Sequence, residues 1–280
     1  MGEIKGIRQE IFKEKIQRVK EVLGNMEDEE QVGVVHEILD DTPFKTQNYL
    51  KYIHEEYYIV HNKENIIKDS VKTYKLEPTK CSKKQKDLFS IVKERNSVRD
   101  YVNEKLEFSD FSNIIYYTFG VKSIKRGAYD KREYPFRYVN SQGGINYLDL
   151  YIIANSVEGI QSGLYYYDFI NNEICMMDYG NLRGIIGDIN YQNEFTQYSN
   201  FVAIMVADLS RVIPKYYKRA YRMAHVDTGI AASYMQLVAE AQGISSCVVA
   251  GYLEHKLEDL LELTENDYPI VMMCFGRQSA

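Results

Sequence analysis

Hydrophobic residues follow a helical period near the start of the chain. Over residues 3–30, isoleucine, valine and leucine recur near helical spacing among glutamates and lysines, which is the pattern of one face of an α-helix. Residues 31–78 mix charged and aromatic side chains without a clear period. We therefore expect residues 1–80 to form a mainly helical accessory region.

Short apolar runs in the rest of the chain are typical of strands. Each run has the length of a strand, and β-branched and aromatic residues are common in them. A turn at Asn171 and Asn172 separates two of the runs. The predicted strands cover residues 148–155, 163–167, 173–177, 200–208, 248–250 and 270–275.

One long helix is predicted between the last two groups of strands. Pro214 suits the first turn of a helix, because proline lacks an N–H that this turn leaves unpaired, and Gly243 marks the end. The middle of the helix is rich in small residues, which permit another helix to approach closely. Helices and strands in this order predict an α+β fold, with a mixed central sheet flanked by helices, over residues 81–280.

Composition and charge narrow the class of protein. With 280 residues, 45% of them hydrophobic, the chain can bury a large core without disulfides or metals. The net charge is −6, with 34 basic and 40 acidic residues interspersed, which argues against nucleic acid and membrane surfaces as partners. The longest apolar stretches fall far short of the roughly 20 residues of a membrane span, and the N-terminus lacks a signal-peptide core. We expect a cytoplasmic protein.

Cysteines and histidines give no metal-binding pattern. Cys81, Cys175, Cys247 and Cys274 are widely separated and form no CxxC pair, so buried, reduced thiols are expected. The five histidines lack the HExxH spacing of a zinc site, and His225 is interpreted as a packed, hydrogen-bonded core residue. Serine-hydrolase, Walker and GxGxxG motifs are also missing.

Three short segments carry candidate chemistry. Arg95, Ser97 and Arg99 place two guanidinium groups and a hydroxyl together, which suits a phosphate monoester. Taken alone, this segment is more typical of a solvated basic turn. Paired glycines at Gly143 and Gly144 precede a strand and would let the backbone approach a flat ligand, although an ordinary turn has the same pattern.

The third segment is a helix start at Lys215 and Tyr216. Adjacent residues serve one pocket only near a helix end, and Pro214 places them there. A nearby ammonium group and the positive end of the helix dipole both lower the pKa of a phenol, which favours its use as a base. The alternative interpretation is a solvated basic first turn.

In this order, the segments resemble the SagB-type dehydrogenases of the nitroreductase superfamily, which oxidise azolines in thiazole/oxazole-modified peptide biosynthesis. The likeness spans roughly residues 82–276. Residues 95–101 resemble the family's R-x-S-x-R-x-[FY] segment, and residues 163–168 resemble its G-L-Y-x-Y-D strand. The Lys215–Tyr216 pair and the Ala250–Gly251 step also match.

The resemblance implies a nitroreductase-like fold that binds FMN, and a homodimer with the flavin at its interface. It implies Lys215 and Tyr216 as the catalytic pair, with Tyr216 removing a proton from a peptide thiazoline or oxazoline. The implied cofactor-binding residues are Arg95, Ser97, Arg99, Gln142, Gly143, Gly144, Ala250 and Gly251. A precursor peptide and a cyclodehydratase are the implied partners, docking on residues 1–80.

The sequence also departs from the family pattern. The family's P-S-[AG]-G loop appears as Ser-Gln-Gly-Gly at residues 141–144, and Leu148 and Leu150 replace its usual proline and glutamate. Two other functions therefore stay open: an NAD(P)H-dependent nitro- or quinone-type reductase, and a non-catalytic scaffold subunit of a biosynthetic complex.

Overall fold

The computed structural model describes residues 2–40, 63–79, 86–126 and 133–278. The chain forms two compact units, Met1–Lys45 and Thr46–Ala280. The first unit consists of α1 (Gly2–Leu23) and α2 (Asp28–Asp40). The helix predicted over residues 3–30 is thus interrupted by a turn. Three acidic residues open α2, where the helix dipole favours negative charge.

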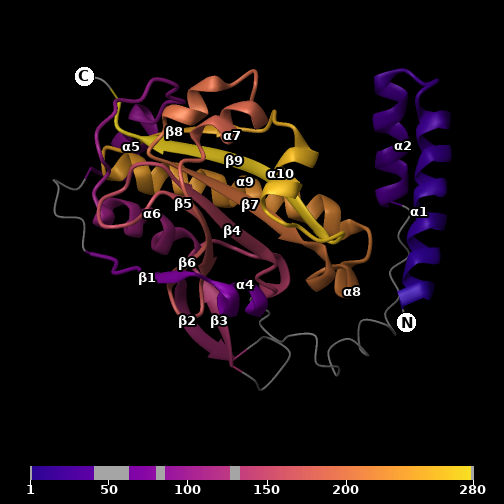
Figure 1. Cartoon of the computed structure of the whole chain (residues 1–280), viewed down its shortest axis with the longest axis horizontal. Coiled ribbons are helices and arrows are strands. Elements are labelled where there is room, and N and C mark those ends of the chain that lie inside the picture. Colours follow the sequence, from indigo (N-terminus) through magenta and orange to yellow (C-terminus); the bar gives the residue numbers. More distant parts are fainter. Residues whose placement is uncertain (1, 41–62, 80–85, 127–132, 279–280) are drawn as a thin grey trace. The chain divides into compact units, whose positions relative to one another are not determined.

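The second unit is built on a seven-stranded sheet (Figure 1). Its strand pairs are all antiparallel, while isolated parallel bridges join Ser97 to Ser246 and Leu106 to Val157. The predicted α+β fold is confirmed. In spatial order the strands are β1 (Lys72–Lys75), β6 (Glu173–Tyr179), β5 (Gly163–Asp168), β4 (Leu148–Ala154), β7 (Phe201–Asp208), β9 (Asp267–Gly276) and β8 (Ser245–Val249).

Six of these strands were predicted from their apolar runs, and β4, β5 and β7 are buried at every position. Strand β1 and a hairpin of β2 (Val121–Arg126) and β3 (Glu133–Arg137) were not predicted. The side chains of β1 and β2 are largely exposed, so these strands have no regular hydrophobic period in the sequence. Since β1 pairs with β6, residues 72–75 belong to the central sheet, whereas the sequence placed the domain boundary after residue 80.

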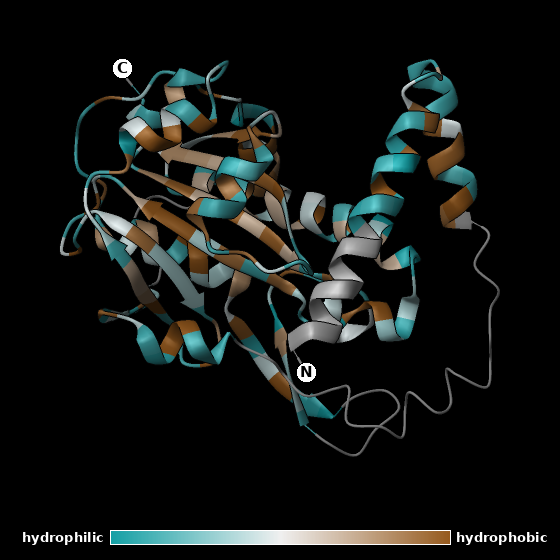
Figure 2. Cartoon of the chain, turned by 45° about the vertical axis from the view of Figure 1, so that its right-hand side comes forward, coloured by the Kyte–Doolittle hydropathy of each residue, from teal (hydrophilic) through white to brown (hydrophobic). Residues whose placement is uncertain are grey.

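Helices cover both faces of the sheet. Helices α6 (Phe108–Phe119) and α9 (Arg219–Ala241) pack on one face and share its apolar core. Helices α7 (Arg183–Ile189) and α10 (Glu254–Leu260) contribute to a second core on the other face. Hydrophobic residues concentrate on the strands between these layers (Figure 2). Shorter elements are α4 (Glu64–Asp69), α5 (Leu88–Glu94) and the 3-10 turn η2 (Glu194–Tyr198).

The long helix predicted from Pro214 to Gly243 is divided in two. Helix α8 covers Ile213–Tyr216, and α9 begins at Arg219. Between them Tyr217 adopts φ 55° and ψ −143°, a conformation that side-chain-bearing residues rarely adopt. No glycine or proline marks this break, which explains why the sequence pattern does not predict it.

Other residue-level expectations can be compared with the structure. Cys175, Cys247 and Cys274 are buried, free thiols as predicted, and burial raises the pKa of Cys175 to about 12. Cys81 lies outside the described residues. The expectation of a core histidine was wrong, because His225 is exposed; its ring packs against Tyr221 on the helix surface.

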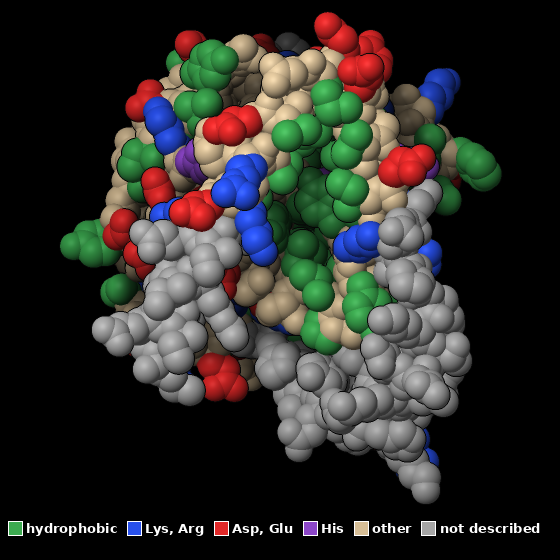
Figure 3. Space-filling view, turned by 90° about the vertical axis from the view of Figure 1, so that its right-hand side faces the viewer, with side chains coloured by type: hydrophobic (Ala, Val, Ile, Leu, Met, Phe, Trp, Pro, Cys, Tyr) green, Lys and Arg blue, Asp and Glu red, His purple; other side chains and the backbone are tan. Residues whose placement is uncertain are grey.

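Surface charge agrees with the sequence. Acidic and basic side chains are interspersed on the face drawn in Figure 3. Among the described residues, no helix has both the length and the apolar character needed to cross a membrane.

Candidate functional site

The register of the sheet brings two separate segments to one end. Leu148, the first residue of β4, pairs with Ala207 near the end of β7, and Asp208 pairs with Asp267 at the start of β9. The glycine turn η1 (Gln142–Gly144) precedes β4, while η3 (Leu209–Arg211) and α8 follow β7. The turn and the helix therefore meet at this end of the sheet.

Helix α8 presents the predicted catalytic pair. Lys215 is only 8% exposed, although it carries an ammonium group, and its Nζ lies 5.3 Å from the centre of the Tyr216 ring. Tyr216 is half-buried and packs against the main core. The strained residue Tyr217 ends α8 directly after the pair, so α9 does not continue its helical turn.

The glycine turn η1 lies in direct contact with this pair. Gly143 and Gly144 both have positive φ, 66° and 68°. A Cβ atom at Gly143 would lie 2.5 Å from Tyr216 Oη and 3.0 Å from Lys215 Nζ. Atoms of both predicted catalytic side chains thus converge on the backbone of Gly143, and a side chain at this position would require Tyr216 or Lys215 to move.

A buried carboxylate that the sequence analysis missed holds this turn. Asp227 on α9 is fully buried, and its Oδ2 accepts 2.8 Å hydrogen bonds from the Gln142 backbone N–H and from the Tyr147 hydroxyl. Burial, reinforced by the Asp227 charge, raises the pKa of Tyr147, so this hydroxyl stays protonated and continues to donate. The sequence did contain a signal for Asp227, because it is an acidic residue among the small residues of the predicted long helix.

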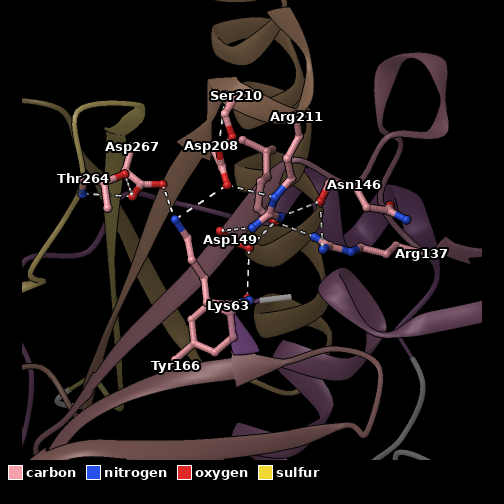
Figure 4. Close-up of polar contacts among 11 residues, drawn as sticks. Lys63, Arg137, Asn146, Asp149, Tyr166, Asp208, Ser210, Arg211, Thr264 and Asp267 are labelled. Carbon is pink, nitrogen blue, oxygen red and sulfur yellow. Dashed lines mark hydrogen bonds and ion pairs between the residues drawn. The ribbon is translucent and has the colours of Figure 1, made fainter. Parts of the chain in front are cut away.

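A second missed group, a buried cluster of charged side chains, joins the exit of the turn to η3 (Figure 4). Arg211 forms a bidentate pair with Asp149, at 3.0 and 2.8 Å. The Asn146 carbonyl accepts from both Arg211 and Arg137, each at 3.3 Å, and Arg137 also donates to the Leu148 carbonyl at 2.7 Å. Burial lowers the pKa of Arg137 to about 10. The cluster fixes the position of the residues that follow η1 relative to those that lead into α8.

The same cluster contains three carboxylates, from Asp149, Asp208 and Asp267, whose oxygens lie within 4.8 Å of one another. Such a group has the ligand type of a metal site, but cations of the chain already lie among them. Lys63 Nζ is 2.5 Å from Asp267 and 3.6 Å from Asp208, and Arg211 Nε is 3.0 Å from Asp208. Paired in this way, the carboxylates form an ion-pair network.

The predicted phosphate-binding segment lies along the outer edge of β8. Ser97 forms a parallel bridge with Ser246, and the Val98 N–H donates to the Ser246 carbonyl at 3.0 Å. Arg95 is half-buried and Arg99 exposed, and within the described residues neither guanidinium forms an ion pair with an acid. The Arg99 guanidinium lies 5.9 Å from the centre of the Phe195 ring.

Ala250 and Gly251 lie immediately after β8, and the Gly251 carbonyl accepts a 3.2 Å hydrogen bond from the Asn193 side chain. Val249 pairs with Met272, which in turn pairs with Ile204 in the middle of β7, so these two residues leave the sheet halfway along β9. The structure thus brings the catalytic pair and the glycine turn into contact. It places the other predicted cofactor-binding residues along β8, which β9 separates from β7.

These residues fit the two chemical ends of FMN. Guanidinium groups and a hydroxyl suit its phosphate, while a glycine backbone beside a buried ammonium group suits a planar ring that carries carbonyl acceptors. The close approach of Tyr216 Oη and Lys215 Nζ to the Gly143 backbone is the structural observation at the ring end.

Comparison with known proteins gives one consistent family. Residues 92–277 match the model of the nitroreductase family. A Methanocaldococcus jannaschii protein assigned to the nitroreductases is 25% identical over 191 residues, which cover 68% of this chain and 91% of that protein.

Three solved structures of similar fold have identities to this chain of 20% or less, so they show the fold alone. A structure from Anabaena variabilis assigned to the nitroreductases has a TM-score of 0.64 and 20% identity over 82% of this chain, which spans only 47% of that chain. One from Ralstonia eutropha has a TM-score of 0.58 and 20% identity, covering 74% of this chain and 90% of its own. A chain of the Escherichia coli microcin synthetase McbBCD complex, with truncated pro-MccB17 bound, has a TM-score of 0.54 and 16% identity. That match covers 93% of this chain and 98% of the microcin synthetase chain.

Proposed function

The chain belongs to the nitroreductase family, a family of flavin-type oxidoreductases, and we propose that it is an FMN-dependent dehydrogenase that oxidises peptide thiazolines and oxazolines to thiazoles and oxazoles. The observation that carries this proposal is the convergence of Tyr216 Oη and Lys215 Nζ on the backbone of Gly143. A simple flavin reductase has no need of a phenol and an ammonium group at this position.

Each residue of the proposed site has a distinct task. Arg95, Ser97 and Arg99 would hold the FMN phosphate, and the turn η1 with residues 250–251 would line the ring end. FMN supplies the hydride acceptor when bound. Tyr216 removes the proton from the azoline ring, assisted by the Lys215 ammonium group, which lies 5.3 Å from the centre of the Tyr216 ring. A positioned base of this kind contributes about 10²–10⁴ in rate.

Partners follow from the same proposal. The microcin synthetase chain resembles this chain over nearly its full length, which supports a precursor peptide as substrate and a cyclodehydratase as partner. We propose a homodimer as the flavin-binding form. Light scattering of the flavin-loaded protein tests it directly, because a monomer that keeps its flavin would contradict a site at a dimer interface.

A second function, an NAD(P)H-dependent nitro- or quinone-type reductase, is supported by the M. jannaschii relative. It uses the same fold and the same flavin, but neither a peptide partner nor the Lys215–Tyr216 pair. The two functions therefore differ in substrate and in their dependence on Tyr216.

The deciding experiment supplies the FMN-loaded protein with a peptide that carries a preformed thiazoline or oxazoline. Loss of two hydrogens per ring is followed by mass spectrometry, and oxidation of NADPH with a nitroaromatic acceptor is measured in parallel. We expect ring oxidation that falls by about 10²-fold or more in Tyr216→Phe, with FMN still bound. Tyr179→Phe, an exposed tyrosine at the end of β6, is the control and keeps full turnover.

Three outcomes would contradict the proposal in whole or in part. A wild-type protein that reduces the nitroaromatic compound but leaves the azoline unchanged is a reductase. Full ring oxidation in Tyr216→Phe would remove the base assignment while leaving the flavin assignment intact. A purified protein that takes up no FMN would favour the scaffold subunit instead.

A further inference from the structure

The carboxylate of Asp227 joins α9 to the glycine turn. Its Oδ2 is 2.8 Å from the Gln142 backbone nitrogen and 2.8 Å from the Tyr147 hydroxyl, and the side chain has no exposed surface. Hydrogen bonds to a charged acceptor are stronger than those between neutral groups. Two donors, one at the start of the glycine turn and one just after it, are thus held at one point.

This point lies one residue from the catalytic contact. Gln142, whose N–H is held by Asp227, directly precedes Gly143, whose backbone lies against Tyr216 Oη and Lys215 Nζ. A shift of the Gln142 nitrogen would carry Gly143 with it, because one rigid peptide plane and two dihedral angles separate them. The position of the turn relative to the catalytic pair therefore depends on Asp227.

The arrangement is costly for the fold. The other oxygen, Oδ1, is buried and accepts no hydrogen bond from the described residues, and the neighbouring Thr228 hydroxyl is in the same state. A buried carboxylate with part of its acceptor capacity unused is less favourable than an apolar side chain of similar volume. A functional constraint on the turn explains why such a group stands at this position.

We propose that Asp227 is a positioning residue for the Lys215–Tyr216 pair, acting through the Gln142 backbone and the Tyr147 hydroxyl. It holds the turn η1 at the distance from which a substrate ring and the Tyr216 oxygen can meet. This inference rests on the proposed function of the pair, since it assigns Asp227 a part in the same proton transfer. Asp227 itself contacts neither substrate nor flavin in this scheme.

The test compares Asp227→Ala, which removes both acceptor atoms, with Asp227→Asn, which keeps one oxygen of the same shape. Both are made in the full chain and loaded with FMN. We expect kcat for azoline oxidation to fall about 10- to 100-fold in Asp227→Ala, with a smaller fall in Asp227→Asn. The KM for the peptide changes by less than about threefold, because a loss confined to the transition state leaves ground-state binding intact.

A second readout is independent of turnover. Hydrogen–deuterium exchange of the peptide that covers residues 141–147 should be faster in Asp227→Ala than in the wild type. Tyr147→Phe should have a smaller effect on kcat in the Asp227→Ala background than in the wild type, because the two residues act as one unit.

Asp168 provides the matched control. It is also fully buried, and its Oδ1 accepts from the backbone N–H groups of Ile170 and Asn171, at 3.0 and 3.2 Å, in a turn after β5. Asp168→Ala removes a similar carboxylate and lowers stability, yet it should leave kcat and exchange over residues 141–147 unchanged.

The outcomes separate this inference from the proposed function. If wild-type protein fails to oxidise the azoline, the proposed function is wrong, while exchange over residues 141–147 still shows whether Asp227 holds the turn. If the wild type is active and Asp227→Ala retains its kcat and its exchange rate, the positioning role is wrong. Should Asp227→Ala fail to fold, Asp227→Asn decides by the same two measurements.

Discussion

At Gly143 the missing side chain is what allows a turn of the backbone to touch both Tyr216 and Lys215. Gly143→Ala would place a methyl group 2.5 Å from Tyr216 Oη and 3.0 Å from Lys215 Nζ. One of these side chains must then move, or the turn must withdraw. We expect azoline oxidation to fall at least about tenfold, because small misplacements at a reacting centre are costly, as measured by kcat with saturating peptide.

A variant at the adjacent Gly144 distinguishes the effect of this contact from the effect of backbone strain. Gly144 has nearly the same φ, 68° against 66°, but the atom nearest to its Cβ position is a ring carbon of Phe136 at 3.7 Å, an ordinary contact. Gly144→Ala therefore carries a similar conformational cost without the collision. Equal losses of activity in the two variants would show that strain, and not contact with the catalytic pair, is responsible.

Tyr217 is the residue whose conformation keeps α8 and α9 apart. Its φ of 55° with ψ of −143° costs about 1–3 kcal/mol for a residue with a side chain. We expect Tyr217→Gly to be more stable than Tyr217→Ala by about 1 kcal/mol, measured by urea denaturation, because both lose the ring but only glycine relieves the strain. Tyr217→Gly should also have a lower kcat than Tyr217→Ala, since its more flexible backbone no longer fixes the positions of Lys215 and Tyr216.

Glu262 offers a control position for the relief of backbone strain away from the site. It has a φ of 51° after α10, so a comparison of Glu262→Gly with Glu262→Ala repeats the backbone change there. Both should retain the wild-type kcat. If the glycine variant at position 217 does the same, the break between α8 and α9 has no part in turnover.

At the scale of elements, ion pairs between side chains connect the ends of neighbouring strands. Lys63, just before α4, pairs with Asp267 at the start of β9 and with Asp208 at the end of β7. Burial opposes ionisation of Asp267, but hydrogen bonds from Lys63 and Thr264 outweigh it and hold the pKa of Asp267 below its usual value. Lys63→Met leaves these buried carboxylates without one of their cations, which should lower the unfolding free energy at pH 7 by about 3 kcal/mol.

The pH dependence of this loss has a definite sign. Because the pKa of Asp267 is lowered by folding, its ion pair stabilises the protein above the unfolded value of about 4 and is lost as the pH falls through the lower, folded value. The difference in stability between wild type and Lys63→Met should therefore shrink below about pH 4. Lys68→Met, which breaks an exposed pair with Glu64, should cost less than about 1 kcal/mol at any pH.

The elements also show what a sequence pattern can reveal. Strands such as β7 could be predicted because every position is buried, and burial selects apolar residues. The hairpin of β2 and β3 has mostly exposed side chains on β2, so its pairing leaves no such mark. Lys215, Tyr216 and Gly143 were predicted as separate motifs, and the structure shows their contact. Asp227 and Arg211 were missed, because their roles depend on partners 85 and 62 residues away in sequence.

At the scale of the whole molecule, the chain separates into a small helical unit and a unit that contains the entire central sheet. Several valines and isoleucines of α1 and α2 are exposed, among them Val19, Val22, Val32 and Ile38. The seven-stranded sheet, both apolar cores and all predicted site residues belong to Thr46–Ala280. We therefore propose that the two units have separable tasks, catalysis in the second and partner docking in the first.

Removal of residues 1–45 tests this separation. We expect the remaining chain to fold, to take up FMN and to oxidise a short azoline peptide with unchanged kcat, because no described hydrogen bond or ion pair of the site comes from α1 or α2. Conversion of a full precursor peptide, assayed together with its cyclodehydratase, should fall at least about tenfold, as expected when docking no longer raises the effective concentration of the peptide.

Full-length protein with Val19→Ser and Val32→Ser should behave in the same way if the exposed apolar residues make the contact. If the truncated chain converts the full precursor as fast as the full-length protein, the first unit has another task; if it fails on the short peptide as well, the two units are not independent.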